Sequence, residues 1–177
     1  MVDAPVADGP PRGLLIAAVL VPAAAVAVLL GVAASRQTPP APVAIAAVPA
    51  PQDRSPECKT LLADLPDQLG DFRRTATVEP TPAGTAAWRA DGDPVILRCG
   101  LDRPAEFVVG VPLQLVDQVQ WFRLEDPGTG RSTWVCVDRP VYVVLTLPDG
   151  SGPTPIQTLS AVIDSTMPAV PISPGEP

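Results

Sequence analysis

Residues 132–147 read STWVCVDRPVYVVLTL, and this stretch decides the fold. β-branched and aromatic residues fill it on both sides of Arg139-Pro140, so it predicts two strands joined by a turn. Residues 126–130 (DPGTG) form a preceding reversal, and residues 115–124 supply another apolar strand. These three strands predict an antiparallel meander.

Shorter patterns extend this meander into a domain. Further strands are expected at residues 72–78, 85–89 and 95–99. Ser55-Pro56 combines a helix-capping residue with a proline at the first helical position, and leucines follow at helical spacing. Residues 154–167 repeat the cap-and-proline start before an amphipathic pattern. The sequence therefore predicts an α+β fold, with a mostly antiparallel sheet flanked by an N-terminal and a C-terminal helix.

Two low-complexity segments flank this predicted domain of residues 55–167. Residues 35–54 are rich in Pro and Ala, and they hold five prolines between Gln37 and Arg54. We expect them to form an extended linker without regular secondary structure. Residues 168–177 are expected to be a disordered tail.

Residues 14–34 (LLIAAVLVPAAAVAVLLGVAA) are 21 consecutive residues without a charge. As a helix they would extend about 31 Å, close to the bilayer core of about 30 Å. We expect a single-pass transmembrane signal anchor, with residues 1–13 as a short cytoplasmic tail and an extracytoplasmic C-terminal domain. The alternative is a signal peptide that is cleaved near Ala34, where small residues resemble a cleavage site.

The three cysteines all follow the apolar segment. They are Cys58, Cys99 and Cys136, without a CxxC pair. In an exported domain this odd number predicts one disulfide and one free thiol, with three pairings open. We favour Cys58 with Cys99, because Cys58 lies on the apolar face of a predicted helix and Cys99 ends a predicted strand. The alternative is three reduced thiols in a cytosolic domain.

Composition excludes several kinds of function. The chain has no histidine, which removes His-dependent catalysis and most zinc sites, so no cofactor or metal is predicted. The formal net charge of −7 argues against nucleic-acid binding, which needs a basic surface. Eleven arginines beside one lysine, with abundant Ala, Val and Pro, are typical of a GC-rich genome such as that of an actinobacterium.

Three motifs after the apolar segment carry a family resemblance. They are CKTLL at residues 58–62, followed by Leu65-Pro66, then VILRCG at residues 95–100 and VDRPVYV at residues 137–143. In this combination the chain resembles the actinobacterial envelope proteins known as domain of unknown function 3515, over residues 58–148. The resemblance implies a membrane-anchored or secreted envelope protein. It supports the pairing of Cys58 with Cys99 and implies no activity.

Two arginines are candidate contacts for a ligand or partner. Arg98 and the Asp138-Arg139 pair interrupt apolar strands. A guanidinium in such a place must reach solvent, an anionic ligand or an internal acid. An ion pair of Arg98 with Asp138 or with Asp102 is the structural alternative.

Among the aromatic residues, Trp121 is the candidate partner contact. It precedes Phe122 and Arg123, and an exposed patch of this composition could anchor an envelope protein or a glycan. Trp134 and Tyr142 are expected to pack in the core.

We therefore expect a membrane-tethered extracytoplasmic module of the cell envelope that binds or positions another component and is not an enzyme. The alternative is a carboxylate-dependent hydrolase acting on a cell-wall polymer, which needs two acids in one cleft. Its candidates are Asp91 with Asp93 and Glu125 with Asp126, although all four also fit solvated turns.

Overall fold

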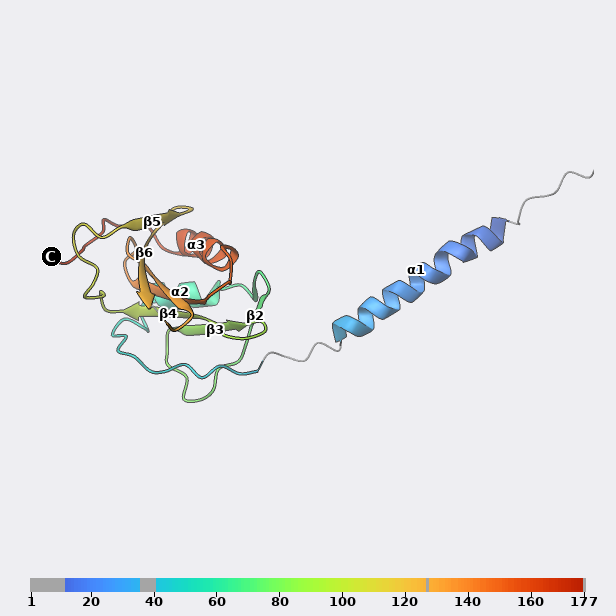
Figure 1. The fold of residues 1–177 in the computed structure, drawn as a ribbon, viewed down its shortest axis with the longest axis horizontal. Coiled ribbons are helices and arrows are strands. Elements are labelled where there is room, and N and C mark those ends of the chain that lie inside the picture. Colours follow the sequence, from blue (N-terminus) through green and yellow to red (C-terminus); the bar gives the residue numbers. More distant parts are fainter. Residues whose placement is uncertain (1–11, 36–40, 127, 177) are drawn as a thin grey trace, which may run out of the picture. The chain divides into compact units, whose positions relative to one another are not determined.

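The computed structural model describes residues 12–35, 41–126 and 128–176. The chain divides into two units, Met1–Pro39 and Pro40–Pro177. In the first unit, α1 (Arg12–Ser35) is a 24-residue helix that contains Pro22 (Figure 1). Large apolar side chains such as Leu20, Val21 and Leu29 are exposed on it.

No helix in the part of the chain that the structure describes is long and apolar enough to cross a membrane. Membrane anchoring by residues 14–34 stays a prediction, as does cleavage near Ala34.

The second unit is built on one eight-stranded antiparallel sheet among the described residues. The strand order is β1-β2-β3-β4-β8-β7-β6-β5, so two four-stranded meanders are joined through β4 and β8. Along that junction Leu97 lies opposite Leu145, and Cys99 lies opposite Val143. The strands are β1 (Gln68–Leu69), β2 (Phe72–Arg74), β3 (Thr85–Arg89), β4 (Val95–Leu101), β5 (Leu113–Val116), β6 (Val119–Asp126), β7 (Arg131–Cys136) and β8 (Tyr142–Pro148).

The predicted meander is confirmed as β6, β7 and β8, but the strand expected at residues 115–124 is a hairpin. β5 and β6 pair around a two-residue turn in which Asp117 has a φ of 52°. Aspartate tolerates this left-handed conformation better than most residues do, and the sequence holds no glycine here to reveal the turn. The strand expected at residues 72–78 is also shorter, because β2 ends at Arg74.

Two helices cover one face of the sheet, which confirms the α+β fold with its flanking helices. α2 (Pro56–Ala63) begins as predicted, with the Ser55 hydroxyl accepting a hydrogen bond from the Cys58 N–H at 3.2 Å. α3 (Thr154–Thr166) packs on α2 and on the strands β1, β5 and β6. The main core lies between these helices and the sheet, and its largest buried residues include Leu61, Trp88, Leu97, Trp121, Leu145, Leu159 and Ile163.

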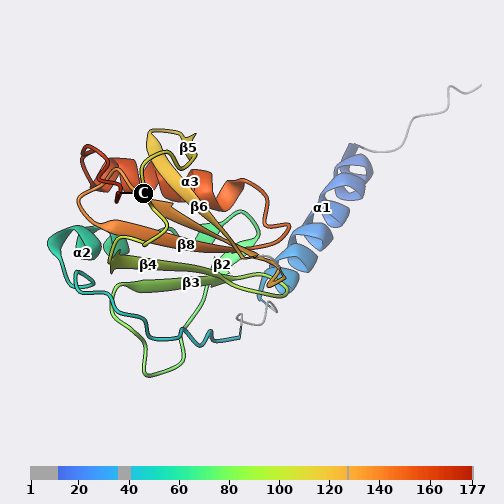
Figure 2. The same ribbon diagram turned by 60° about the vertical axis from the view of Figure 1, so that its left-hand side comes forward.

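An extended N-terminal segment covers part of the opposite face, where a linker was expected. Val43 and Ile45 are 2% and 6% exposed and pack on Ala87 and Ile96. In Figures 1 and 2 the segment after residue 41 runs on the side of β3 away from α3. Residues 41–54 are extended and contain no helix or strand, as predicted, but they pack on the domain and do not form a free linker.

The C-terminal segment is ordered in the same way as far as residue 176. The Gly175 N–H donates to the Phe107 carbonyl at 2.8 Å, and the Val109 N–H donates to the Gly175 carbonyl at 3.0 Å. The Val170 N–H donates to the Asp138 carbonyl at 2.9 Å. These bonds hold the segment beside a second cluster of buried residues, which comprises Phe107, Phe122, Val135, Val137 and Val144. The prediction of a disordered tail at residues 168–177 was therefore wrong for its described part.

Gly100 explains how the N-terminal segment can approach β4 so closely. Its φ is +86°, and a Cβ at this position would lie within van der Waals radii of the backbone of Gln52 and Asp53. The Gln52 N–H donates to the Gly100 carbonyl at 3.0 Å. Glycine is required here because it alone adopts this φ without strain and leaves room for the neighbouring backbone.

Candidate functional site

The disulfide joins α2 to the centre of the sheet. Cys58 on α2 is bonded to Cys99 on β4, with 5.7 Å between the two Cα atoms. This confirms the favoured pairing of the three that the sequence left open. Cys136 is the free cysteine and is buried. Burial raises the pKa of its thiol, and the charge of Asp138 raises it further, so the thiol stays protonated and unreactive.

Arg139 is a buried connector in the fold, not a surface ligand contact. It forms an ion pair with Asp138 at 3.0 Å, and its other guanidinium nitrogen contacts Asp164 of α3 at 2.8 Å. The same nitrogen donates to the Gln118 carbonyl at 3.0 Å. Because the side chain is fully buried and both terminal guanidinium nitrogens have internal acceptors, no atom of it is available to an external anion. Arg139 is therefore not a contact for a ligand or partner in the folded domain.

Trp121 also lies inside the molecule, where an exposed patch was expected. It is 0% exposed, and its indole N–H donates to the Ser160 hydroxyl of α3 at 3.0 Å. On β6 the side chains alternate, and Trp121 faces the helices while Phe122 faces the opposite side. This position excludes contact between Trp121 and a partner in the folded domain.

Arg98 lies on the face opposite the helices and contacts the N-terminal segment. Its guanidinium donates to the Ala46 carbonyl at 3.4 Å. Asp138, one of the two acids proposed as its partner, is instead paired with Arg139. Burial lowers the pKa of Arg98 from its usual value, although an arginine remains charged. The hollow beside it is about 20 Å³, enough for about one water molecule, so nothing larger binds here without rearrangement.

A larger groove lies on the helix-covered face, between the first turn of α3 and strands β5 to β7. Its volume is about 370 Å³, within the range of about 300–1,000 Å³ that is typical of ligand sites. We call it the Trp134 groove, and its lining comprises Gln114, Val116, Arg123, Ser132, Trp134, residues 147–153, Ile156 and Gln157.

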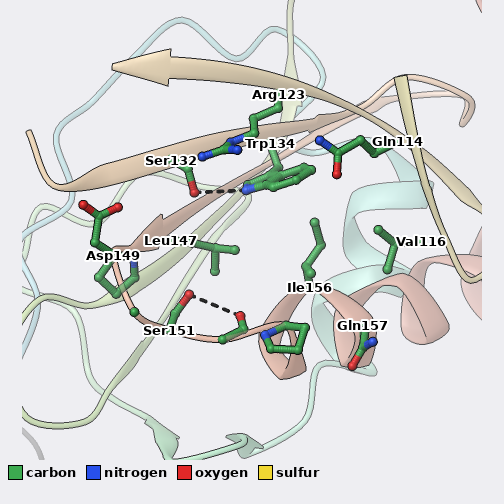
Figure 3. Close-up of a pocket in the computed structure, with 14 residues that line it drawn as sticks. Gln114, Val116, Arg123, Ser132, Trp134, Leu147, Asp149, Ser151, Ile156 and Gln157 are labelled. Carbon is green, nitrogen blue, oxygen red and sulfur yellow. Dashed lines mark hydrogen bonds between the residues drawn. The ribbon is translucent and has the colours of Figure 1, made fainter. Parts of the chain in front are cut away.

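Two contacts orient Trp134 in this groove. Its indole N–H donates to the Ser132 hydroxyl at 3.1 Å, and the Arg123 guanidinium lies 5.4 Å from its ring centroid. Figure 3 shows Arg123 on one side of the ring and Leu147 and Ile156 on the other. The ring is therefore fixed in orientation, with one face toward the apolar floor of the groove.

Polar side chains stand at the rim. Gln114 and Asp149 lie at opposite ends of the groove in Figure 3, and Gln157 lies on α3 beside its floor. All three are exposed. The arrangement combines an apolar floor, an aromatic ring and a few hydrogen-bonding groups, which is the usual composition of a site for a small ligand.

The acids that a hydrolase would need lie beside this groove. Asp91, Asp93 and Asp149 line a second hollow of about 360 Å³, but all three are exposed in turns. Asp93 is also paired with Arg131 at 3.1 Å. A general acid of a glycosidase needs a buried, apolar setting that none of them has. The side chains of Glu125 and Asp126 lie outside the described residues.

Within the described residues, no group of three or more Cys, Asp or Glu side chains is arranged to hold a metal ion.

Comparison with known proteins assigns the family. A model of the family described as "Protein of unknown function (DUF3515)" matches residues 18–172, most of the chain. The chain belongs to this family. No match was found among curated proteins or among solved structures.

The three motifs quoted from the sequence have structural roles in this DUF3515 protein. CKTLL supplies α2 and one half of the disulfide, and VILRCG supplies the other half together with Gly100. VDRPVYV supplies the buried ion pair of Asp138 with Arg139. None of the three lines the Trp134 groove, so the motifs identify the fold and not the candidate site.

The sequence also contains little that would have revealed the groove. Its residues come from four strands, a loop and a helix. Trp121 and Trp134 occupy equivalent alternating positions on neighbouring strands and face the same side of the sheet. α3 covers the first and not the second, and no local pattern predicts where a helix stops covering a sheet.

Proposed function

We propose that this protein is an extracytoplasmic binding module of the actinobacterial cell envelope, tethered by residues 14–34, and that its ligand binds in the Trp134 groove. It binds or positions another envelope component and catalyses no reaction. The groove is the observation that carries the proposal, because it is a hollow of ligand size with an apolar floor and a polar rim.

Export is supported by the cysteines and by the N-terminal segment. A disulfide between Cys58 and Cys99 is typical of an oxidising compartment. Residues 14–34 carry no charge, and the described large apolar side chains of α1 are exposed. A helix that is apolar on all sides requires an apolar environment. Cleavage near Ala34 would give the same domain as a secreted protein.

The location can be tested through Lys59, the only lysine of the chain, which is exposed on α2. Intact cells are treated with a membrane-impermeant amine reagent, and the labelled sites are identified by mass spectrometry. We expect Lys59 to be modified in intact cells. Modification only after cell lysis would place the domain inside and refute the proposal.

The ligand site can be tested by photocrosslinking in living cells. A photoreactive diazirine amino acid replaces Gln157 at the groove, and in a matched control it replaces Lys59 outside the groove. We expect a specific adduct from position 157 that is absent at position 59. Trp134→Ala should reduce its yield, because loss of a central aromatic contact costs about 2 kcal/mol or more. Equal labelling at both positions would show that the groove is not a binding site.

A further inference from the structure

The groups around the Trp134 groove specify the chemistry of its ligand. The Trp134 ring presents one face to the groove, and the face of an indole carries partial negative charge. The C–H groups on one side of a sugar ring carry partial positive charge and form a flat apolar surface. Such a ring fits a fixed indole face with an apolar floor beside it.

The rim supplies partners for hydroxyl groups. Gln114 and Gln157 each offer an amide that donates and accepts, and the Asp149 carboxylate accepts from two donors. No ion pair of Asp149 is found in the described part of the chain. A hydroxyl that donates to this carboxylate forms a charge-assisted hydrogen bond, which is stronger than a neutral one.

The charges around the groove select against an anion. Asp149 also lines the neighbouring hollow, with Asp91 and Asp93, and the whole chain carries a formal charge of −7. Among the lining residues that the structure describes, the cation is Arg123, and it lies over the Trp134 ring on the side away from the floor. A carboxylate or phosphate in the groove would meet the charge of Asp149, while the Arg123 guanidinium is already engaged with the Trp134 ring.

We propose that the Trp134 groove binds an uncharged saccharide, with a sugar ring stacked on Trp134 and its hydroxyl groups bonded to Asp149 and the two glutamines. This inference rests on the proposed function and names the ligand class of the same site. An envelope polysaccharide and a free sugar share this chemistry.

The inference can be tested by titrating the full-length protein with saccharides. The protein is held in a detergent without a sugar headgroup, because maltoside detergents would compete. The neutral probes are cellotetraose, maltotetraose and mannotetraose. Glucose and mannose serve as free sugars, and tetragalacturonate serves as the anionic control. Trp88 and Trp121 are 0% exposed, so a change in tryptophan fluorescence reports on Trp134.

We expect at least one neutral tetrasaccharide to bind with a Kd of about 1 mM or tighter. Tighter binding of the tetrasaccharide than of its monosaccharide would indicate a polymer as the ligand, and equal binding a free sugar. Asp149→Ala should weaken binding about tenfold, because a charge-assisted bond is lost. Asp102→Asn, an exposed acid outside the groove, should leave it unchanged. Gln157→Ala is a second variant at an exposed position, where folding is not at risk, and should weaken binding about threefold.

Three results would overturn the inference. They are no saturable binding of any neutral saccharide, equal binding of tetragalacturonate, or equal affinity in Asp149→Ala and Asp102→Asn. If a crosslinked adduct at position 157 proved to be a protein or a lipid, the saccharide would be refuted while the binding function stood. Absence of that adduct would refute both the binding function and the saccharide ligand.

Discussion

Individual residues show how burial changes the meaning of a charged or aromatic side chain. Arg139 and Trp121 were both candidates for external contacts, and both have internal partners instead. The sequence correctly indicated that a guanidinium within an apolar stretch needs a partner. It could not show that Asp138 and Asp164 supply it, because Asp164 is on a helix 25 residues away in the chain.

Substitution of Arg139 tests its structural role. Arg139→Met should lower the free energy of unfolding by about 3–5 kcal/mol, because the Asp138 carboxylate, 3% exposed, would lose its cation. Asp164→Asn is the matched control, because the Asp164 side chain is 46% exposed. This substitution should lower the free energy of unfolding by only about 1 kcal/mol or less. Urea unfolding followed by tryptophan fluorescence measures both. Equal small losses would show that Arg139 does not hold the fold together.

At the scale of helices and strands, the sequence was most informative where a residue restricts the backbone. Ser55-Pro56 located the start of α2, and the turn at Arg139-Pro140 separated β7 from β8. The sequence did not reveal the turn at Asp117, which is made without glycine or proline. Leu69 follows the preceding leucines at helical spacing in the sequence, but it lies in β1, because α2 ends at Ala63, just before Pro66.

The disulfide is the covalent link between these elements. It closes a loop of 41 residues, and the chain-entropy estimate gives it about 4 kcal/mol. The double variant Cys58→Ser with Cys99→Ser should lose about that much stability in thermal or urea unfolding. Cys136→Ala, which leaves the crosslink intact, should lose less.

Alkylation of the protein from its native cells provides the independent check. Iodoacetamide should label no thiol in the folded protein and one in the unreduced, denatured protein, since Cys136 is buried and the other two are bonded. Three labels in the denatured protein would contradict both the disulfide and the oxidising location.

The whole molecule departs most from the sequence-based expectation at its ends. Residues 41–54 and 168–176 lack periodicity, so their composition alone indicated a linker and a tail. The apolar run in β8 was a signal that both faces of the sheet are buried, since a half-exposed strand would alternate. Two helices cover one face. On the other face Val43 and Ile45 pack on β3 and β4, and Phe107 packs on Phe122 of β6.

Truncation tests this domain boundary. A chain of residues 41–177 should fold with the stability of the intact domain, whereas residues 55–177 should lose about 3 kcal/mol or more. Removal of Val43 and Ile45 uncovers Ala87 and Ile96. Each buried side chain that is removed lowers the free energy of unfolding by about 1.5–3 kcal/mol. Circular dichroism during heating measures the difference. Equal melting temperatures of the two chains would show that the folded domain begins at residue 55.

The placement of Val43 and Ile45 has a practical consequence for measurements on this protein. They attach the incoming chain to the side of the sheet away from α3, whereas the Trp134 groove opens on the side of α3. A biotin or affinity tag introduced ahead of residue 41 would therefore attach the domain through the face opposite the groove. On a biosensor chip prepared in this way, the point of attachment does not block the groove.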